Sequence, residues 1–232
     1  PEIEKLVNDT INRGGCLFIP SFSVERAQLM MLVFWTLLKE NKIPKVQMIM
    51  DSPMGANILE LFHRTRDWHR LKDNECDEMC SYFTVVSSYR ETMELRTDNK
   101  PKIVIAGSGM LTGGRMLNYL ETQAQNPKNT LLFIGYQAEG TRGRKLLEGD
   151  KELKVYGKWV PFNMEVAEIK GLSAHADHAE LMDWMSKLNN KPERIFIVHG
   201  EKESAEALQK GIKETHGWDA EIPELYSIEE IE

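Results

Sequence analysis

His175 is the residue of this sequence best placed to transfer a proton. It lies in the segment GLSAHADH (171–178), directly before a helix whose start Asp177 and Glu180 predict by their capping-box spacing. A loop imidazole is accessible to reactants and titrates near neutrality, as a general acid or base must. This segment by itself fits equally well with a polar turn histidine that has no chemical task.

His199 is the second histidine with a chemical interpretation. It follows the apolar run at 194–198, which we expect to be a buried strand, and Gly200 after it permits a turn. The imidazole would then project beyond the carboxyl end of the sheet, a position that suits a metal ligand.

A hydrolytic zinc centre needs at least three nitrogen, oxygen or sulfur ligands, and the sequence offers few. The only cluster of suitable residues comprises His175, Asp177, His178 and His199. HExxH, His-x-His and Cys-x-x-Cys motifs do not occur. Cys76 and Cys80 are interpreted as lying on two faces of one helix without further ligands, and His63 as a surface residue. The chain by itself is therefore not expected to assemble a two-metal centre.

The segment GSGMLTGGR (107–115) is the candidate anion-binding loop. Its four glycines lie between an expected strand and an expected helix, where backbone N–H groups can point at a phosphate. Gly107, Ser108 and Arg115 would contact that phosphate, Arg115 through a charge-assisted hydrogen bond. The loop is neither a Walker A motif nor a dinucleotide fingerprint, and turn geometry explains the glycines equally well.

Composition restricts the class of protein. The chain has 232 residues, of which 41% are hydrophobic, and a formal charge of −7 from 29 Lys and Arg against 36 Asp and Glu. This composition argues against a disordered chain, and the overall charge does not indicate a polyanionic partner. The three cysteines are too few for a disulfide framework, and no apolar run approaches the roughly 20 residues of a membrane span. We therefore expect a soluble, cytoplasmic protein.

Parallel βα units must hold these residues in place. Short apolar runs recur, each followed by a loop and a helical pattern, at residues 16–20, 46–50, 102–106, 130–135 and 194–200. This alternation predicts an α/β fold with a mainly parallel sheet, whose functional groups lie in loops beyond the carboxyl ends of the strands. A helix expected over 24–38 would have Ser21 or Ser23 as its N-cap, and Asp51 is interpreted as an N-cap or turn residue. A domain boundary is expected near residue 170.

Six motifs, in this order and spacing, closely resemble the β-CASP branch of the metallo-β-lactamase superfamily. They are FIPSFSVERAQ (18–28), MDSPMG (50–55), GSGMLTGGR (107–115), GYQAEGTRGR (135–144), GLSAHADH (171–178) and IVHGE (197–201). The resemblance runs from about residue 11 to residue 201 and is strongest to the RNA-cleaving members. It implies a parallel-sheet β-CASP domain over 1–170, and over 171–232 the C-terminal part of a metallo-β-lactamase αββα domain.

The resemblance also implies roles for single residues. His175 corresponds to the histidine that donates a proton to the leaving oxygen, and His199 to a zinc ligand. Histidine at position 199 favours RNA over DNA as the substrate. Ser173 is then a candidate hydrogen-bond partner of the scissile phosphate, and the loop at 107–115 would hold a neighbouring phosphate.

The departure from the family pattern is large. The His-x-His-x-Asp-His zinc motif and the first acidic β-CASP motif have no counterpart in this chain, and the chain begins with Pro1. We therefore expect the C-terminal part of a longer protein. The intact protein is expected to be a zinc-dependent ribonuclease with two zinc ions and RNA as its partner. This chain alone is expected to be inactive and to hold no zinc.

Two alternatives stay open at this point. One is a catalytically inactive β-CASP scaffold subunit, against which the presence of both His175 and His199 argues. The other is a nucleotide-binding α/β module that uses the glycine loop. The sequence does not decide between endo- and exonucleolytic cleavage, which RNA is cut, or whether the intact protein forms a homo-oligomer. Arg142, Arg144 and Lys145 either extend an RNA-binding surface or solvate a helix face.

Overall fold

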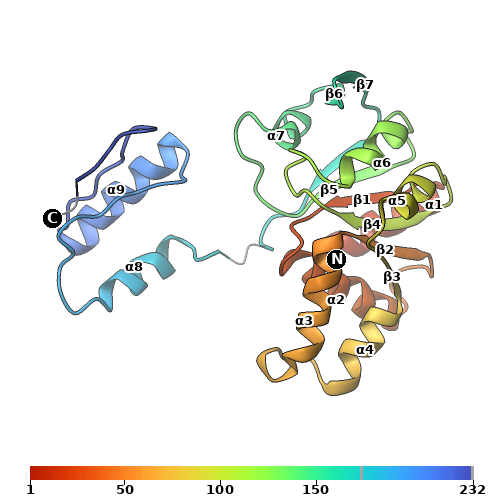
Figure 1. The fold of residues 1–232 in the computed structure, drawn as a ribbon, viewed down its shortest axis with the longest axis horizontal. Coiled ribbons are helices and arrows are strands. Elements are labelled where there is room, and N and C mark those ends of the chain that lie inside the picture. Colours follow the sequence, from red (N-terminus) through yellow and green to blue (C-terminus); the bar gives the residue numbers. More distant parts are fainter. Residues whose placement is uncertain (173–174, 231–232) are drawn as a thin grey trace. The chain divides into compact units, whose positions relative to one another are not determined.

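The computed structural model describes residues 1–172 and 175–230, and its chain divides into two compact units, Pro1–Leu172 and Ser173–Glu232. Figure 1 shows the fold. The helices are α1 Glu2–Asn12, α2 Arg26–Lys39, α3 Pro53–Arg64, α4 Asp73–Ser81, α5 Tyr89–Leu95, α6 Met116–Gln123, α7 Arg142–Leu147, α8 His178–Ser186 and α9 Lys202–His216, with a 3-10 turn η1 at Arg66–Trp68. The strands are β1 Leu17–Pro20, β2 Gln47–Asp51, β3 Phe83–Val86, β4 Lys102–Ala106, β5 Thr130–Phe133, β6 Glu152–Val155, β7 Lys158–Pro161 and β8 Glu165–Glu168.

The first unit is built on one six-stranded sheet. The strand order is β3-β2-β4-β1-β5-β8, and every neighbouring pair is parallel. The prediction of an α/β fold with a parallel sheet is confirmed. Strands β6 and β7 form a separate antiparallel pair.

Both faces of this sheet are covered, which explains why its strands are continuous apolar runs. Side chains alternate between the two faces: Ile103 and Ile105 belong to one buried cluster, and Val104 belongs to the other. Helices α2, α3 and α4 pack on one face, and α6, α7 and the β6–β7 pair pack on the other (Figure 1). A parallel sheet covered in this way presents its functional loops at one edge.

The second unit consists of α8 and α9 around a small apolar core that includes Met182, Met185 and Ile212. Asp177 caps α8 as predicted: its carboxylate accepts from the N–H of Glu180 (2.9 Å), and its own N–H donates to Glu180 (2.8 Å). His178 packs against α9, because a Cβ at Gly211 would collide with its ring.

The prediction of a strand over 194–200 is wrong. Within the described residues the segment makes only a single bridge, between Phe196 and Glu221. Its backbone bonds are Ile197 N–H to Glu221 O (2.8 Å) and Glu221 N–H to Ile195 O (2.8 Å). An apolar run becomes a strand only where a neighbouring segment pairs with it over several residues. Here the neighbouring segment pairs at one residue, Glu221.

No helix of residues 1–172 and 175–230 is long and apolar enough to cross a membrane.

Candidate functional site

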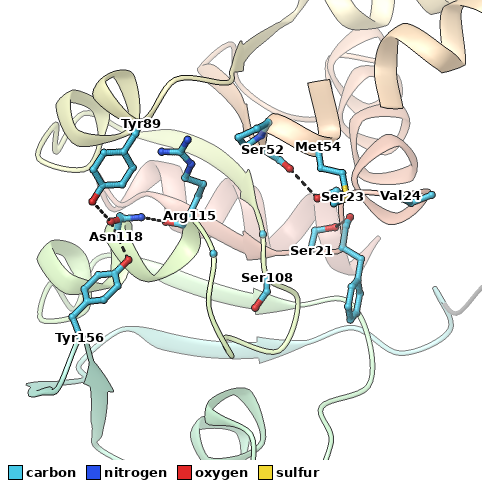
Figure 2. A pocket seen from close by; sticks show the side chains of 14 residues that line it. Ser21, Ser23, Val24, Ser52, Met54, Tyr89, Ser108, Arg115, Asn118 and Tyr156 are labelled. Atoms are coloured by element: carbon cyan, nitrogen blue, oxygen red, sulfur yellow. Dashed lines mark hydrogen bonds between the residues drawn. The ribbon is translucent and has the colours of Figure 1, made fainter. Parts of the chain in front are cut away.

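A pocket of about 720 Å³ opens at the carboxyl ends of β1, β2 and β4, three adjacent strands of the sheet. β1 and β4 are neighbours in the sheet. The connection after β1 leads toward β2 on one side of this pair, and the connection after β4 leads toward β5 on the other side. The two connections therefore leave this edge of the sheet in opposite directions. The pocket is lined by Ser21, Phe22, Ser23, Val24, Ser52, Pro53, Met54, Tyr89, Gly107, Ser108, Gly114, Arg115, Asn118 and Tyr156 (Figure 2). Sheets of this kind bind ligands in such a crevice, and three of its lining residues are the predicted loop residues Gly107, Ser108 and Arg115.

The glycine loop after β4 is folded on itself. Ser108 N–H donates to Gly113 O (3.3 Å), and Gly113 N–H donates to Ser108 Oγ (3.2 Å). Leu111 N–H donates to Ser108 O (3.2 Å). These three N–H groups are used within the loop and are not available to a phosphate.

Gly114 has a structural reason to be glycine. Its φ is +76°, and a Cβ would lie 2.5 Å from the backbone of Gly107 and Ser108. Gly113, its neighbour, has open space around the Cβ position. Replacement by alanine should therefore destabilise the loop at Gly114 but not at Gly113.

Arg115 is the cation of the pocket. Its Nη2 donates to Ser87 O (3.1 Å), and its guanidinium carbon lies 5.0 Å from the centre of the Tyr89 ring. Its Nη1 is buried and has no hydrogen-bond partner among the described residues. A buried guanidinium donor without an acceptor is costly. A phosphate in the pocket would pair with the guanidinium charge, and Nη1 would have to turn toward the pocket to donate to it.

Asp51 is the anion nearest to Arg115. Its Oδ1 lies 3.9 Å from Arg115 Nε, and its Oδ2 accepts from Tyr119 Oη (2.7 Å). Burial raises the pKa of Asp51, against the Tyr119 hydrogen bond and the Arg115 charge, which lower it. Protonation of Asp51 would free the Arg115 charge for an anionic ligand. The interpretation of Asp51 as an N-cap or turn residue is wrong, because it ends β2 and Ser52 caps α3 by accepting from Gly55 N–H (3.0 Å).

Aromatic side chains form the rim of the pocket. Tyr89 and Tyr156 both donate from their hydroxyls to Asn118 Oδ1, at 3.1 and 3.0 Å (Figure 2). Each tyrosine is 56% exposed, and Phe22 is 53% exposed. Exposed, anchored rings are surfaces on which nucleic acid bases stack.

The serines of the loop after β1 do not cap α2. Glu25, with φ +66°, occupies the N-cap position and makes no side-chain cap. Ser23 Oγ instead lies 2.8 Å from Ser52 Oγ, which joins the loops after β1 and β2 (Figure 2). The buried Ser21 donates to Phe22 O (3.0 Å).

Arg142 and Arg144 both make hydrogen bonds within the protein. Arg142 Nη1 donates to Leu111 O (2.9 Å) and its Nε donates to Lys154 O (2.8 Å), so it braces the glycine loop. Arg144 Nε donates to Glu148 Oε1 (2.7 Å). These contacts favour a structural role over phosphate binding for both arginines.

His175 and His199 lie in the second unit. Both are exposed, His175 in the loop before α8 and His199 with φ +67° after the bridge at Phe196. Ser173 lies outside the described residues. Within the described part of the chain, neither histidine joins a group of three metal-ligating side chains, so these residues do not fit a two-zinc centre by themselves.

A different set of ligands does come together, in the first unit. His63, Cys76 and Cys80 place one ligand atom each within 4.8 Å of one another. The interpretation of Cys76 and Cys80 as two faces of a helix is wrong, because residues four apart on a helix share a face. That spacing was the available signal, and the contact with His63 was not readable from the sequence.

Comparison with known proteins gives two family matches. Residues 27–146 match the Beta-Casp domain, and residues 159–223 match the Zn-dependent metallo-hydrolase RNA specificity domain.

Several curated proteins are similar to most of this chain. Transcription termination factor FttA of Methanosarcina mazei is 31% identical over 221 residues, which are 90% of this chain and 35% of that protein. Ribonuclease TTHA0252 of Thermus thermophilus is 33% identical over 221 residues, 90% of this chain and 48% of that protein. An RNase J-like protein of Methanocaldococcus jannaschii is 32% identical over 197 residues, 84% of this chain and 45% of that protein. The chain thus spans between a third and a half of the length of these relatives.

Proposed function

Because the chain belongs to the β-CASP family of the metallo-β-lactamase superfamily, we propose that it supplies the RNA-binding surface of a zinc-dependent ribonuclease. The pocket at the ends of β1, β2 and β4 is the surface that receives the RNA. One observation carries this proposal: Arg115, whose Nη1 has no hydrogen-bond partner among residues 1–172 and 175–230, lines the pocket beside the exposed, anchored rings of Tyr89 and Tyr156. A cation for the phosphate and rings for the bases are the two components of single-strand recognition.

Electrostatics supports this placement. The chain carries a net charge of −7, so attraction of a polyanion must be local. Among the described residues that line the pocket, Arg115 is the only Lys, Arg or His. Ser108, Ser23 and Ser52 add hydroxyl groups that can donate to phosphate oxygens.

The histidines of the second unit are assigned to the chemical step. We infer that His175 delivers a proton to the leaving oxygen of the cleaved phosphodiester, since it is exposed in a loop and an imidazolium is a suitable acid near neutral pH. His199 is assigned one zinc position, and Ser173 a hydrogen bond to the phosphate. The remaining zinc ligands have no place among the described residues of this chain. Two zinc ions in the intact protein, a cytoplasmic location and a homo-oligomer stay predictions.

RNA binding by the 232-residue chain tests the pocket. A fluorescently labelled single-stranded RNA is titrated with wild type, Arg115→Ala and Arg144→Ala, and binding is followed by anisotropy at several salt concentrations. Both variants remove one positive charge, but Arg144 is paired with Glu148. We expect Arg115→Ala to weaken binding by about 10-fold and to reduce the salt slope by about one, as for a lost phosphate contact, and Arg144→Ala to bind like wild type.

The rim is tested by Tyr156→Ala against Tyr156→Phe. A stacking role predicts that alanine weakens binding by roughly 1–3 kcal/mol per base and that phenylalanine does not. Equal binding by wild type and Arg115→Ala would remove this pocket from the RNA path. Complete competition by a mononucleotide such as ATP at equal concentration would favour a nucleotide-binding module instead.

A further inference from the structure

The group His63, Cys76 and Cys80 lies outside the pocket and outside the motifs that identify the family. His63 is in the last turn of α3, and the two cysteines are one turn apart on α4. We propose that these three side chains form a site for one thiophilic divalent cation, with zinc as the metal and a solvent molecule as the fourth ligand.

The geometry matches what zinc requires. His63 Nδ1 lies 3.5 Å from Cys76 Sγ, and all three ligand atoms lie within 4.8 Å of one another. Two sulfurs at about 2.3 Å and one nitrogen at about 2.0 Å from a central ion stand 3 to 4 Å apart, so small side-chain rotations suffice. Two thiolates and one imidazole are a donor set that selects zinc over magnesium or calcium.

The position of the cysteines favours a metal over a disulfide. Residues four apart on a helix have Cβ atoms about 5–6 Å apart, whereas a disulfide needs about 3.5–4.5 Å. Cys76 and Cys80 therefore cannot join without distortion of α4. A metal ion bridges the longer distance without moving the helix.

The surroundings of His63 determine how an ion reaches the site. Asp77 Oδ1 lies 3.1 Å from His63 Nδ1, and Arg66 Nη2 donates to both oxygens of Asp77 (3.1 Å each). Cys76 is fully buried, whereas the side chain of His63 is 30% exposed. Asp77 contacts the same Nδ1 that lies 3.5 Å from Cys76 Sγ, so this contact is given up when that nitrogen binds a metal. The partly exposed His63 side chain gives the ion access from solvent.

The site would tie two helices together at one end. The ligands come from both sides of the connection 65–72, so a bound ion closes that segment and joins α3 to α4. At its other end α3 begins at Pro53, and Ser52, Pro53 and Met54 line the pocket. A metal here would hold the end of the helix that forms one wall of the pocket, and it would be distinct from the two zinc ions expected in the intact protein.

Zinc binding by the purified, reduced 232-residue chain tests the site. Zinc is titrated against a chromogenic chelator, and Co²⁺ is used as a spectroscopic probe. We expect one zinc per chain, bound more tightly than micromolar, which is the opposite of the expectation from the sequence that the chain alone holds no zinc. The cobalt form should show a thiolate-to-cobalt charge-transfer band and the intense visible bands of a tetrahedral ion.

Variants assign the ligands. Cys76→Ser/Cys80→Ser should lose the charge-transfer band and weaken zinc binding by ~100-fold or more, and His63→Ala should weaken it similarly. The matched controls are Cys16→Ser, a buried cysteine in the other buried cluster, and His69→Ala, a nearby histidine stacked on Phe62. Both controls should bind zinc like wild type.

A second measurement guards against variants that misfold. Wild type and the controls should melt at a higher temperature with zinc than with EDTA, and the ligand variants should melt with zinc as wild type does with EDTA. A His199→Ala variant that loses the ion would place it at that histidine and overturn the proposal. Zinc held no tighter than micromolar by wild type, or a cobalt spectrum without a thiolate band, would also overturn it.

Discussion

The pocket of the first unit and the histidines of the second unit differ in how firmly the surrounding structure holds them. Ser108 follows β4, a strand whose five residues are all buried, and Arg115 directly precedes α6. The loop between Ser108 and Arg115 is fixed by its own hydrogen bonds. His175 and His199 are exposed, and only a small core holds the segment between them. Recognition of a polyanion can be built at one edge of one sheet. A hydrolytic centre needs ligands from several segments, and the described residues of this chain bring too few of them together.

This contrast predicts where substitutions act. Changes at the glycine loop should disturb the folding of the first unit and the binding of RNA. Changes at the histidines of the second unit should leave folding nearly intact and affect only the reaction of the intact protein.

The largest effect is expected for His175→Ala in the intact protein. Turnover of RNA should fall by roughly a hundredfold or more, as for loss of a general acid, while zinc content stays near that of wild type. His199→Ala should instead lower the zinc content, measured by elemental analysis after dialysis. His178→Ala is the matched control, since this nearby imidazole packs against Gly211 and is expected to leave turnover near wild type. Equal zinc loss in the His175 and His199 variants would show that His175 has the wrong role.

A smaller effect is expected from the adjacent glycines of the loop. Gly114→Ala should lower the free energy of unfolding by about 2 kcal/mol, because φ is +76° and the new Cβ meets backbone at 2.5 Å. Gly113→Ala should change it by no more than about 0.5 kcal/mol, because nothing lies within 4 Å of its Cβ position. Urea unfolding of the 232-residue chain measures both. Equal stability of the two variants would mean that the loop does not hold the described conformation.

The smallest effect is expected for Asp51→Asn, which should change how the free energy of unfolding depends on pH. Burial raises its pKa above the ordinary 3.8, so the folded state holds the proton more tightly than the unfolded state does. Stability that Asp51 contributes is thus present below pH 3.8 and is lost as pH rises through the raised pKa. Asp51→Asn should remove this loss, and the difference in unfolding free energy between variant and wild type, measured from about pH 4 to pH 7, should shift in favour of the variant.

Asp98→Asn is the control, because the pKa of Asp98 is shifted in the opposite direction to that of Asp51. Hydrogen bonds from Lys100 N–H and from Lys102 lower the pKa of Asp98, so its contribution is present above pH 3.8 and is lost as pH falls through the lowered pKa. The variant should therefore lose stability relative to wild type as pH rises. The same slope for the Asp51 variant and wild type would contradict the raised pKa.

Local sequence carried much of the fold of the first unit. The runs at 16–20, 46–50, 102–106 and 130–135 predicted four strands of the parallel sheet, because a strand buried on both faces must be apolar throughout. The capping box at Asp177 predicted the start of α8, because its hydrogen bonds join residues three apart. The strand expected at 194–200 failed, because pairing depends on a partner strand that local sequence does not specify.

The site was predictable only in part for the same reason. Glycines and a cation between a strand and a helix indicated the loop at 107–115, and the motif order indicated the family. Only the tertiary structure brought Tyr156 and Tyr89 to one Asn118 oxygen. It also left Arg115 Nη1 buried with no hydrogen-bond partner in the described part of the chain. It also placed His63 against Cys76. Sequence determines which groups are present and how neighbours along the chain are spaced, whereas contacts across the chain are set by how helices and strands pack on the sheet.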